Sequence, residues 1–257
     1  MGGFSLKYVQ FYPTLRCNKN CAFCFNQGLE LCDDTTLEDY QTIVKKLKNN
    51  GVSSVDIMGG EPLLNSDISS IVDATLKSGL EVNISTNGTV KKGIRDLLQR
   101  FSGSIRLGVS VNSLKDLRES AEIIRTFRTI TKTVYNEKVV EETTRAVLSL
   151  KPKRHYILYP DILNGGSSSY KIPFYSFYHI WQKRYAPLGI GAVFCGGFLP
   201  EPENSHLRCP AGTVKIGILP DGSVYPCNLF FGIKDFYLGN IYTHSLEEIL
   251  SRPVLEY

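Results

Sequence analysis

The sequence predicts an α/β fold in which a parallel sheet curves into a full or partial barrel. Two observations indicate it: short apolar runs alternate with segments of helical periodicity up to Pro160, and unusual loops follow several of the apolar runs. Right-handed crossovers between such strands would curve the sheet. The loops that follow parallel strands would then share one rim, where the sites of such barrels lie.

Six strands and five helices account for the alternation. Helical spacing is clearest from Leu37 to Asn50, where apolar residues recur every three or four positions and Asn49-Asn50-Gly51 ends the segment. Strands are expected at 7–13, 54–58, 81–85, 105–111, 131–135 and 155–158, and the other helices at 67–78, 94–101, 114–127 and 139–150. An aromatic-rich, partly helical segment at 170–185 is expected to close the barrel edge, or to form a wall of a peptide site.

Three cysteines in C-x3-C-x2-C spacing, Cys17, Cys21 and Cys24, follow the first expected strand. Thiolates are the usual ligands of iron–sulfur clusters, and three of them on a [4Fe–4S] cube leave one iron open. The alternatives are a zinc site completed by a fourth ligand from elsewhere and three unrelated buried cysteines. Zinc sites usually contain two close cysteine pairs, and this sequence has no second close pair, so we favour the cluster.

This stretch resembles the signature of radical SAM enzymes, C-x3-C-x-Φ-C, in which Φ is aromatic, as Phe23 is here. The resemblance implies a TIM-like partial (β/α)6 barrel. It implies that the open iron binds the amino and carboxylate groups of S-adenosylmethionine. One electron from the cluster then cleaves this cofactor to a 5′-deoxyadenosyl radical, which abstracts hydrogen from a substrate. By the same resemblance, Phe23 packs near the adenine.

The loop after the second strand, Gly59-Gly60-Glu61-Pro62, matches the GGEP stretch of that family. Two glycines let the backbone approach a ligand closely, and proline holds the turn. The resemblance implies that this stretch binds the amino group of S-adenosylmethionine. The alternative is an ordinary strand-to-helix turn.

Further cofactor contacts are implied at the ends of the third and fourth strands and in the helix that follows. In the family, Thr-Asn-Gly often ends the third strand, and a polar residue at the end of the fourth faces the ribose. Many relatives have Ser-x-Asp there, so the asparagine found here puts a role for a carboxylate in doubt. An arginine of the next helix would reach the cofactor's carboxylate or lie on the surface. The residues are Thr86, Asn87, Ser110, Asn112, Arg118 and Arg125.

A second cysteine set, Cys195, Cys209 and Cys227, lies in the last quarter of the chain. Asp221-Gly222 between two apolar runs predicts a hairpin, which would bring Cys209 and Cys227 together. The stretch resembles the twitch or truncated SPASM extension, which implies a second, auxiliary [4Fe–4S] cluster with Cys195 as its third ligand. Because no cysteine follows Cys227, we expect one auxiliary cluster. The alternative is a degenerate module without metal.

The fourth iron of the auxiliary cluster has several possible partners: substrate, Cys32, a non-cysteine side chain or a residue beyond this chain. Cys32 otherwise stands alone, as a buried thiol or as a hydrogen-atom donor to a substrate radical. We expect residues 1–190 to form the barrel and residues 191–257 the auxiliary module.

Composition narrows the class of protein. The net charge of +4 is mixed along the 257 residues, so nucleic-acid binding is not indicated. No signal peptide and no membrane-length apolar stretch are present, and seven cysteines favour a reducing compartment, so we expect a soluble, cytoplasmic protein.

The sequence therefore predicts a radical SAM enzyme that modifies a peptide or protein, for example in ribosomal peptide maturation. The alternatives are dehydrogenation of a small alcohol or cyclitol, and a non-enzymatic iron–sulfur redox protein. Cofactor loops on three further strands argue against the last. Flavodoxin or ferredoxin is the implied electron donor. Because the chain starts near its first strand, no leader-peptide domain is expected before it.

Overall fold

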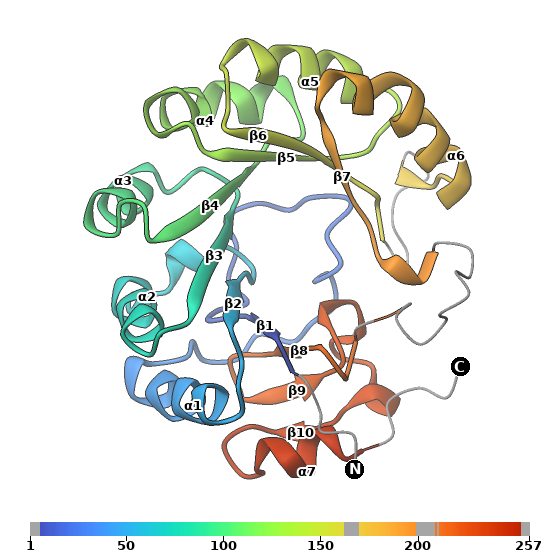
Figure 1. Cartoon of the computed structure of the whole chain (residues 1–257). Coiled ribbons are helices and arrows are strands. Elements are labelled where there is room, and N and C mark those ends of the chain that lie inside the picture. The colour runs from blue at the N-terminus through green and yellow to red at the C-terminus, as the bar shows by residue number, and fades with distance from the viewer. Residues whose placement is uncertain (1–5, 162–169, 199–208, 210, 253–257) are drawn as a thin grey trace.

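The computed structural model describes residues 6–161, 170–198, 209 and 211–252. Within them, one strongly curved sheet has the strand order β10-β9-β8-β1-β2-β3-β4-β5-β6-β7. The helices lie on its convex side, and the segment after β1 crosses the centre of the ring (Figure 1). The strands are β1 Tyr8–Phe11, β2 Ser54–Ile57, β3 Glu81–Thr86, β4 Ile105–Ser110, β5 Ile130–Val134, β6 Arg154–Leu158, β7 Gly191–Val193, β8 Lys215–Ile218, β9 Ser223–Tyr225 and β10 Gly239–Asn240.

Parallel pairing runs without a break from β8 through β1 to β7, whereas β9 and β10 add as antiparallel strands. The partial (β/α)6 barrel expected from the sequence is therefore confirmed. The helices are α1 Leu37–Asn49, α2 Ile68–Lys77, α3 Lys91–Arg100, α4 Leu114–Phe127, α5 Val140–Ser149, α6 Phe174–Ile180 and α7 Leu246–Leu250.

The core lies between the sheet and the helices that cover it. Alternate strand residues such as Val9, Phe11, Val55 and Ile57 point outward and are fully buried. Residues between them face the barrel interior and are mostly polar and half-buried. The barrel therefore has an apolar outer layer and a polar lumen.

Two strand pairings of the barrel were not expected. β7 pairs with β6 beyond the point where the sequence alternation ends. β8 pairs in parallel with β1, Tyr8 opposite Lys215, so the expected hairpin of β8 and β9 is present but extends the main sheet. β7 has only three residues, too few for a pattern, and a parallel pairing over such a separation leaves no local signal.

The aromatic segment packs as expected at the barrel edge. α6 continues into a π-helical turn, Trp181–Tyr185, and Phe174 and Phe177 are buried against Tyr135, Tyr159 and Ile157. Among the helices of the described residues, none is both long and apolar enough to cross a membrane.

Candidate functional site

The first cysteine set lies in the loop that leaves the C-terminal end of β1. Cys17 is exposed, and Cys21 and Cys24 are half-buried. Burial raises the pKa of Cys21, and the charges of Cys24 and Cys17 raise it further, so the three sulfurs lie within electrostatic reach of one another. Because each thiolate makes ionisation of the others less favourable, a bound cation is needed to stabilise all three thiolates together. Iron ions of a cluster would supply that positive charge.

No group of three or more histidine, cysteine or acidic residues in the described chain is arranged around a single metal ion. This arrangement is compatible with a cube, because each thiolate of a [4Fe–4S] cluster binds a different iron. The donor set and its placement on the rim therefore fit a cluster better than a single zinc ion.

The stem of this loop is closed by a buried amide. Asn65 donates from its Nδ2 to the carbonyls of Pro13 and Thr35, both at 2.9 Å, and the Thr35 amide also donates to Pro13 at 2.9 Å. An Arg16–Asp34 ion pair spans the stem further out. The two ends of a loop of about twenty residues are thus fixed together on the rim.

Gly59 and Gly60 pack against this stem. The amides of Gly60 and Glu61 donate to the carbonyls of Thr14 and Arg16, at 3.0 and 2.8 Å. A Cβ on Gly60 would lie 2.2 Å from the Arg16 oxygen, and one on Gly59 would lie 2.6 Å from the Thr14 oxygen. The glycines therefore let two segments of this chain approach each other, in addition to any approach to a ligand.

Glu61 is fully buried and joins the loops after β2 and β3. Its carboxylate accepts from Thr86 Oγ1 and the Asn87 amide, both at 2.7 Å, and from the Leu63 amide at 3.3 Å. Burial raises the pKa of Glu61, against the lowering effect of these donors. Pro62 begins the short 3-10 helix Pro62–Leu64 that Glu61 caps. Glu61 therefore positions the rim rather than facing open space.

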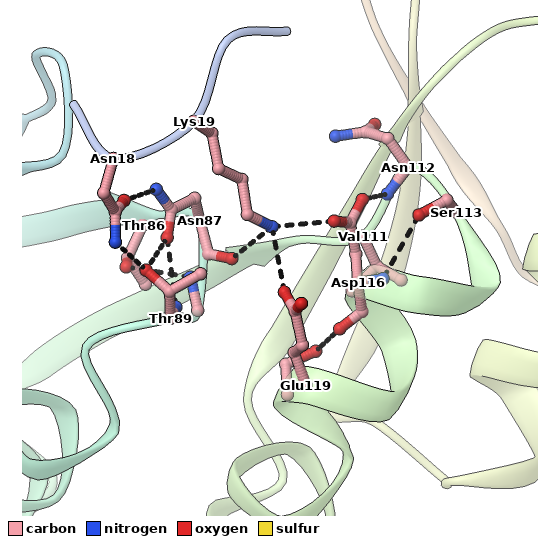
Figure 2. Close-up of polar contacts among 12 residues, drawn as sticks. Asn18, Lys19, Thr86, Asn87, Thr89, Val111, Asn112, Ser113, Asp116 and Glu119 are labelled. Carbon is pink, nitrogen blue, oxygen red and sulfur yellow. Dashed lines mark hydrogen bonds and ion pairs between the residues drawn. The ribbon is translucent and has the colours of Figure 1, made fainter.

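A second polar network, shown in Figure 2, ties the cysteine loop to β3 and α4. Lys19, between Cys17 and Cys21, lies 2.7 Å from Asp116 Oδ1 and 3.6 Å from Glu119 Oε2, and donates to the Asn87 carbonyl at 3.4 Å. Asn18 Oδ1 accepts from Asn87 Nδ2, and Asn18 Nδ2 donates to Thr89 Oγ1, each at 2.8 Å.

These loop residues were missed in the sequence, although one signal was present. Asn18 and Lys19 lie inside the cysteine motif, and Asp116 lies in the first turn of α4, shortly after β4. All three therefore lie near the C-terminal ends of strands, where the site was expected.

The end of β4 carries the remaining candidates. The Asn112 amide donates to Asp116 Oδ2 at 2.9 Å, so a carboxylate does lie at this rim, supplied by α4. Asn112 Oδ1 accepts from the Val134 amide, and Ser110 is half-buried beside Lys132 of β5. Arg118 and Arg125 are exposed on α4, without an ion pair among the described residues.

Phe23 is half-buried against the aromatic segment, its ring 5.1 Å from that of Tyr170. This contact joins the cysteine loop to the far edge of the barrel.

The second cysteine set lies beside the strands at the two ends of the barrel, with Cys195 after β7, Cys209 before β8 and Cys227 after β9. Cys227 is buried, and Cys195 and Cys209 are half-buried. Burial raises the pKa of Cys227, Lys215 lowers it, and the charge of Cys209 raises it, so the hairpin does bring these two thiols near each other. Cys195, Cys209 and Cys227 all act electrostatically on Lys215. Burial raises the pKa of Tyr12, which follows β1, and the charges of Cys24 and Cys227 raise it further, so a cysteine of each set lies within electrostatic reach of this residue.

Cys32 belongs to neither set. Burial raises its pKa, followed by the charge of Asp221 at the hairpin turn. A surface hollow of about 520 Å³ lies outside the barrel, between α5 and the π-helical turn, and no cysteine lines it. The chemistry-bearing residues are instead gathered around the lumen.

Sequence comparison decides the family. The model of the radical SAM superfamily matches residues 11–160, more than half of the chain. The chain belongs to the radical SAM superfamily. The model of the SPASM iron–sulfur cluster-binding domain matches residues 209–257. Together the two matches imply [4Fe–4S] clusters and S-adenosylmethionine as cofactors of this radical SAM protein.

Two curated relatives are similar to this chain over different shares of its length. The chain is 26% identical to the antilisterial bacteriocin subtilosin biosynthesis protein AlbA of Bacillus subtilis, over 96% of this chain and 60% of that protein. It is 36% identical to a probable GTP 3′,8-cyclase of Pyrobaculum aerophilum, over 43% of this chain and 36% of that protein.

Among solved structures, Streptococcus suis SuiB bound to its precursor peptide SuiA has a TM-score of 0.78 at 19% identity, over 96% of this chain and 65% of SuiB. This likeness shows the fold. The chain spans less than two thirds of the length of each of these three proteins.

Proposed function

We propose that this radical SAM protein modifies a peptide or protein substrate, using one cluster to cleave S-adenosylmethionine and a second to handle electrons. The observation that carries the proposal is the similarity to AlbA, which extends over 96% of the chain and thus includes both cysteine sets. The match to the GTP cyclase covers 43% of the chain, so it supports only a shared part of the barrel.

We assign Cys17, Cys21 and Cys24 to the first [4Fe–4S] cluster. When bound, this cluster and S-adenosylmethionine supply a 5′-deoxyadenosyl radical that abstracts hydrogen from the substrate. The rim around the cysteines seats the cofactor through Gly59, Gly60, Pro62, Thr86, Asn87, Ser110 and Asn112, with Phe23 beside the adenine. Glu61 and Lys19 act on other residues: they hold the loops after β2 and β3, and the start of α4, against the cysteine loop.

We assign Cys195, Cys209 and Cys227 to the auxiliary cluster. Cys24 of the first set and Cys227 of the second both lie within electrostatic reach of Tyr12, which supports a role for the second cluster in accepting the electron that remains after hydrogen abstraction, or in anchoring the substrate. Flavodoxin or ferredoxin is the proposed donor to the first cluster.

The cluster assignments are tested by iron and sulfide analysis with EPR after anaerobic reconstitution. We compare the parent with a triple variant, Cys17→Ala, Cys21→Ala and Cys24→Ala. The expected result is loss of 5′-deoxyadenosine formation in the triple variant, together with retention of a [4Fe–4S] signal from the second set. A triple variant without iron would remove the auxiliary cluster from the proposal.

The substrate class is tested by 5′-deoxyadenosine formation with three substrate groups: a synthetic peptide library, small alcohols and cyclitols, and nucleoside triphosphates. We expect peptides alone to stimulate turnover and to lose hydrogen atoms, as measured by mass spectrometry. Stimulation by an alcohol or nucleotide, with none by peptides, would refute the peptide assignment while leaving the cofactor chemistry intact.

A further inference from the structure

Lys215 lies where main-chain contacts bring the segments of Cys209 and Cys227 together. It is the first residue of β8 and pairs with Tyr8 of β1. In the hairpin Gly217 pairs with Tyr225, so Lys215 and Cys227 each lie two residues beyond this pair. The Gly212 amide donates to the carbonyls of Lys215 at 2.8 Å and Pro226 at 3.1 Å, which fixes the segment after Cys209 at the same place.

Lys215 is half-buried, and its neighbours are thiols and a phenol, which are neutral unless they lose a proton. It lies within electrostatic reach of the thiols of Cys195, Cys209 and Cys227 and of the Tyr8 phenol. The described carboxylates form no ion pair with Lys215 within 4 Å, whereas Lys19 has two such neighbours.

Two carboxyl groups, Asp56 of β2 and Asp161 after β6, also lie within electrostatic reach of Lys215. Burial raises the pKa of both, that of Asp161 to about 7, and the Asp56 carboxyl already accepts a hydrogen bond from Asn83 Nδ2 at 2.7 Å. A cation withdrawn from water is costly unless an anion faces it. The three cysteines bind iron as thiolates, and these are the anions best placed to balance the charge of Lys215.

We propose that Lys215 is the counter-charge of the auxiliary cluster and holds its reduction potential high enough for it to accept an electron. Each electron added makes a thiolate-ligated cluster more negative by one charge. A fixed positive charge at short range stabilises the reduced form more than the oxidised form. Lys215 is thus a positioning residue: it changes the reduction potential of the cluster without binding iron itself. The inference rests on the proposed function only in requiring a cluster at the second cysteine set.

The test is a potentiometric titration followed by EPR, on the full chain carrying Cys17→Ala, Cys21→Ala and Cys24→Ala, so that the signal reports the second set alone. Into this background we introduce Lys215→Met, Lys215→Arg or, as a matched control, Lys132→Met. Lys132 is also a buried lumen lysine, but its ammonium donates to Ser85 at 2.7 Å and no cysteine acts on it.

The expected result is a midpoint potential shifted to a more negative value in Lys215→Met, with Lys215→Arg and Lys132→Met close to the background. If Lys215→Met folds by circular dichroism but binds no iron while Lys215→Arg does, the need for positive charge is supported through assembly of the site. Equal potentials in Lys215→Met and the background, at equal iron content, would overturn the inference. Absence of iron from the background itself would instead refute the auxiliary cluster, and the inference with it.

Discussion

At the scale of single residues, buried ionisable groups set how this protein responds to pH. His155 of β6 lies in the layer between the sheet and α5, with its Nδ1 2.9 Å from Thr131 Oγ1 and its Nε2 3.4 Å from Thr144 Oγ1. Burial lowers the pKa of His155 to about 4. The imidazole is therefore neutral in the folded protein at pH values where it would be charged in the unfolded chain.

His155 predicts a loss of stability in acid. Between pH about 6.5 and 4 this imidazole is protonated in the unfolded chain but not in the folded protein. As the pH falls through this window, the free energy of unfolding therefore falls by up to roughly 3 kcal/mol. Above this window His155 leaves the free energy of unfolding unchanged. His155→Gln removes the titration, and its melting temperature should fall less than that of the parent between pH 7.5 and 5. The exposed His179→Gln is the control, compared at equal iron content. Parallel pH profiles of His155→Gln and the parent would contradict this account.

At the scale of elements, the rim is organised by contacts between loops that follow different strands. The stem of the cysteine loop runs beside Gly59 and Gly60, and the loop itself is tied to β3 and α4 through Asn18 and Lys19. The position of the three thiols therefore depends on the start of α4 as much as on their own loop.

Gly60→Ala should displace the stem of the cysteine loop, because its methyl group would overlap the Arg16 and Leu15 carbonyl oxygens. We expect a stability loss of about 1–3 kcal/mol and reduced iron in the first cluster. Gly51→Ala is the control: it has a positive φ of 75° and open space, so it tests backbone strain alone. Iron analysis and thermal unfolding measure both effects. Full iron content in Gly60→Ala would show that the stem does not position the cysteines.

Lys19→Met should weaken S-adenosylmethionine binding several-fold and lower stability by about 1–2 kcal/mol, because it leaves the Asp116 carboxylate at the rim without its cation. Calorimetric titration of the reconstituted protein measures the affinity. Arg95→Met breaks the exposed Arg95–Glu122 ion pair and should change neither quantity measurably. If both variants bind S-adenosylmethionine like the parent, the Lys19 contact has no part in shaping the site.

At the scale of the whole molecule, the barrel and the SPASM-matching segment share one sheet, because β8 hydrogen-bonds to β1. Ile216 of β8 is fully buried in the same core cluster as Val9 and Val55. The single tryptophan, Trp181, lies at the opposite edge, where its indole donates to the Ile190 carbonyl at 2.9 Å. The two edges can therefore be monitored separately.

Ile216→Ala should destabilise the entire chain by about 2–5 kcal/mol, since a buried side chain is lost from a shared core. Denaturation followed by Trp181 fluorescence and by far-UV circular dichroism should shift by the same amount. Val193→Ala, at an exposed position of β7, is the control and should shift neither curve. A Trp181 transition that stays in place would mean that the two segments unfold independently.

Local patterns were enough to predict the alternation of strands and helices, the rim and the hairpin. Amphipathic helices and glycine or cysteine motifs can be recognised from residues that are close together in the sequence. They could not reveal that β8 joins β1, that Glu61 faces Thr86 and Asn87, or that Lys215 lies among three thiols. Each of those depends on pairings between distant segments, and a polar side chain within a strand gives no local sign of which strand it will meet.

The pairing of β1 with β8 also bears on how the protein is made. Lys215 pairs with Tyr8, which leaves the ribosome 207 residues earlier. At translation rates of roughly 5–20 residues per second, one side of β1 stays without its partner for roughly 10–40 s. Unpaired strand edges associate readily with other chains. Slower or colder expression prolongs this exposure, so yield should depend more on chaperone supply during synthesis than on the stability of the finished protein.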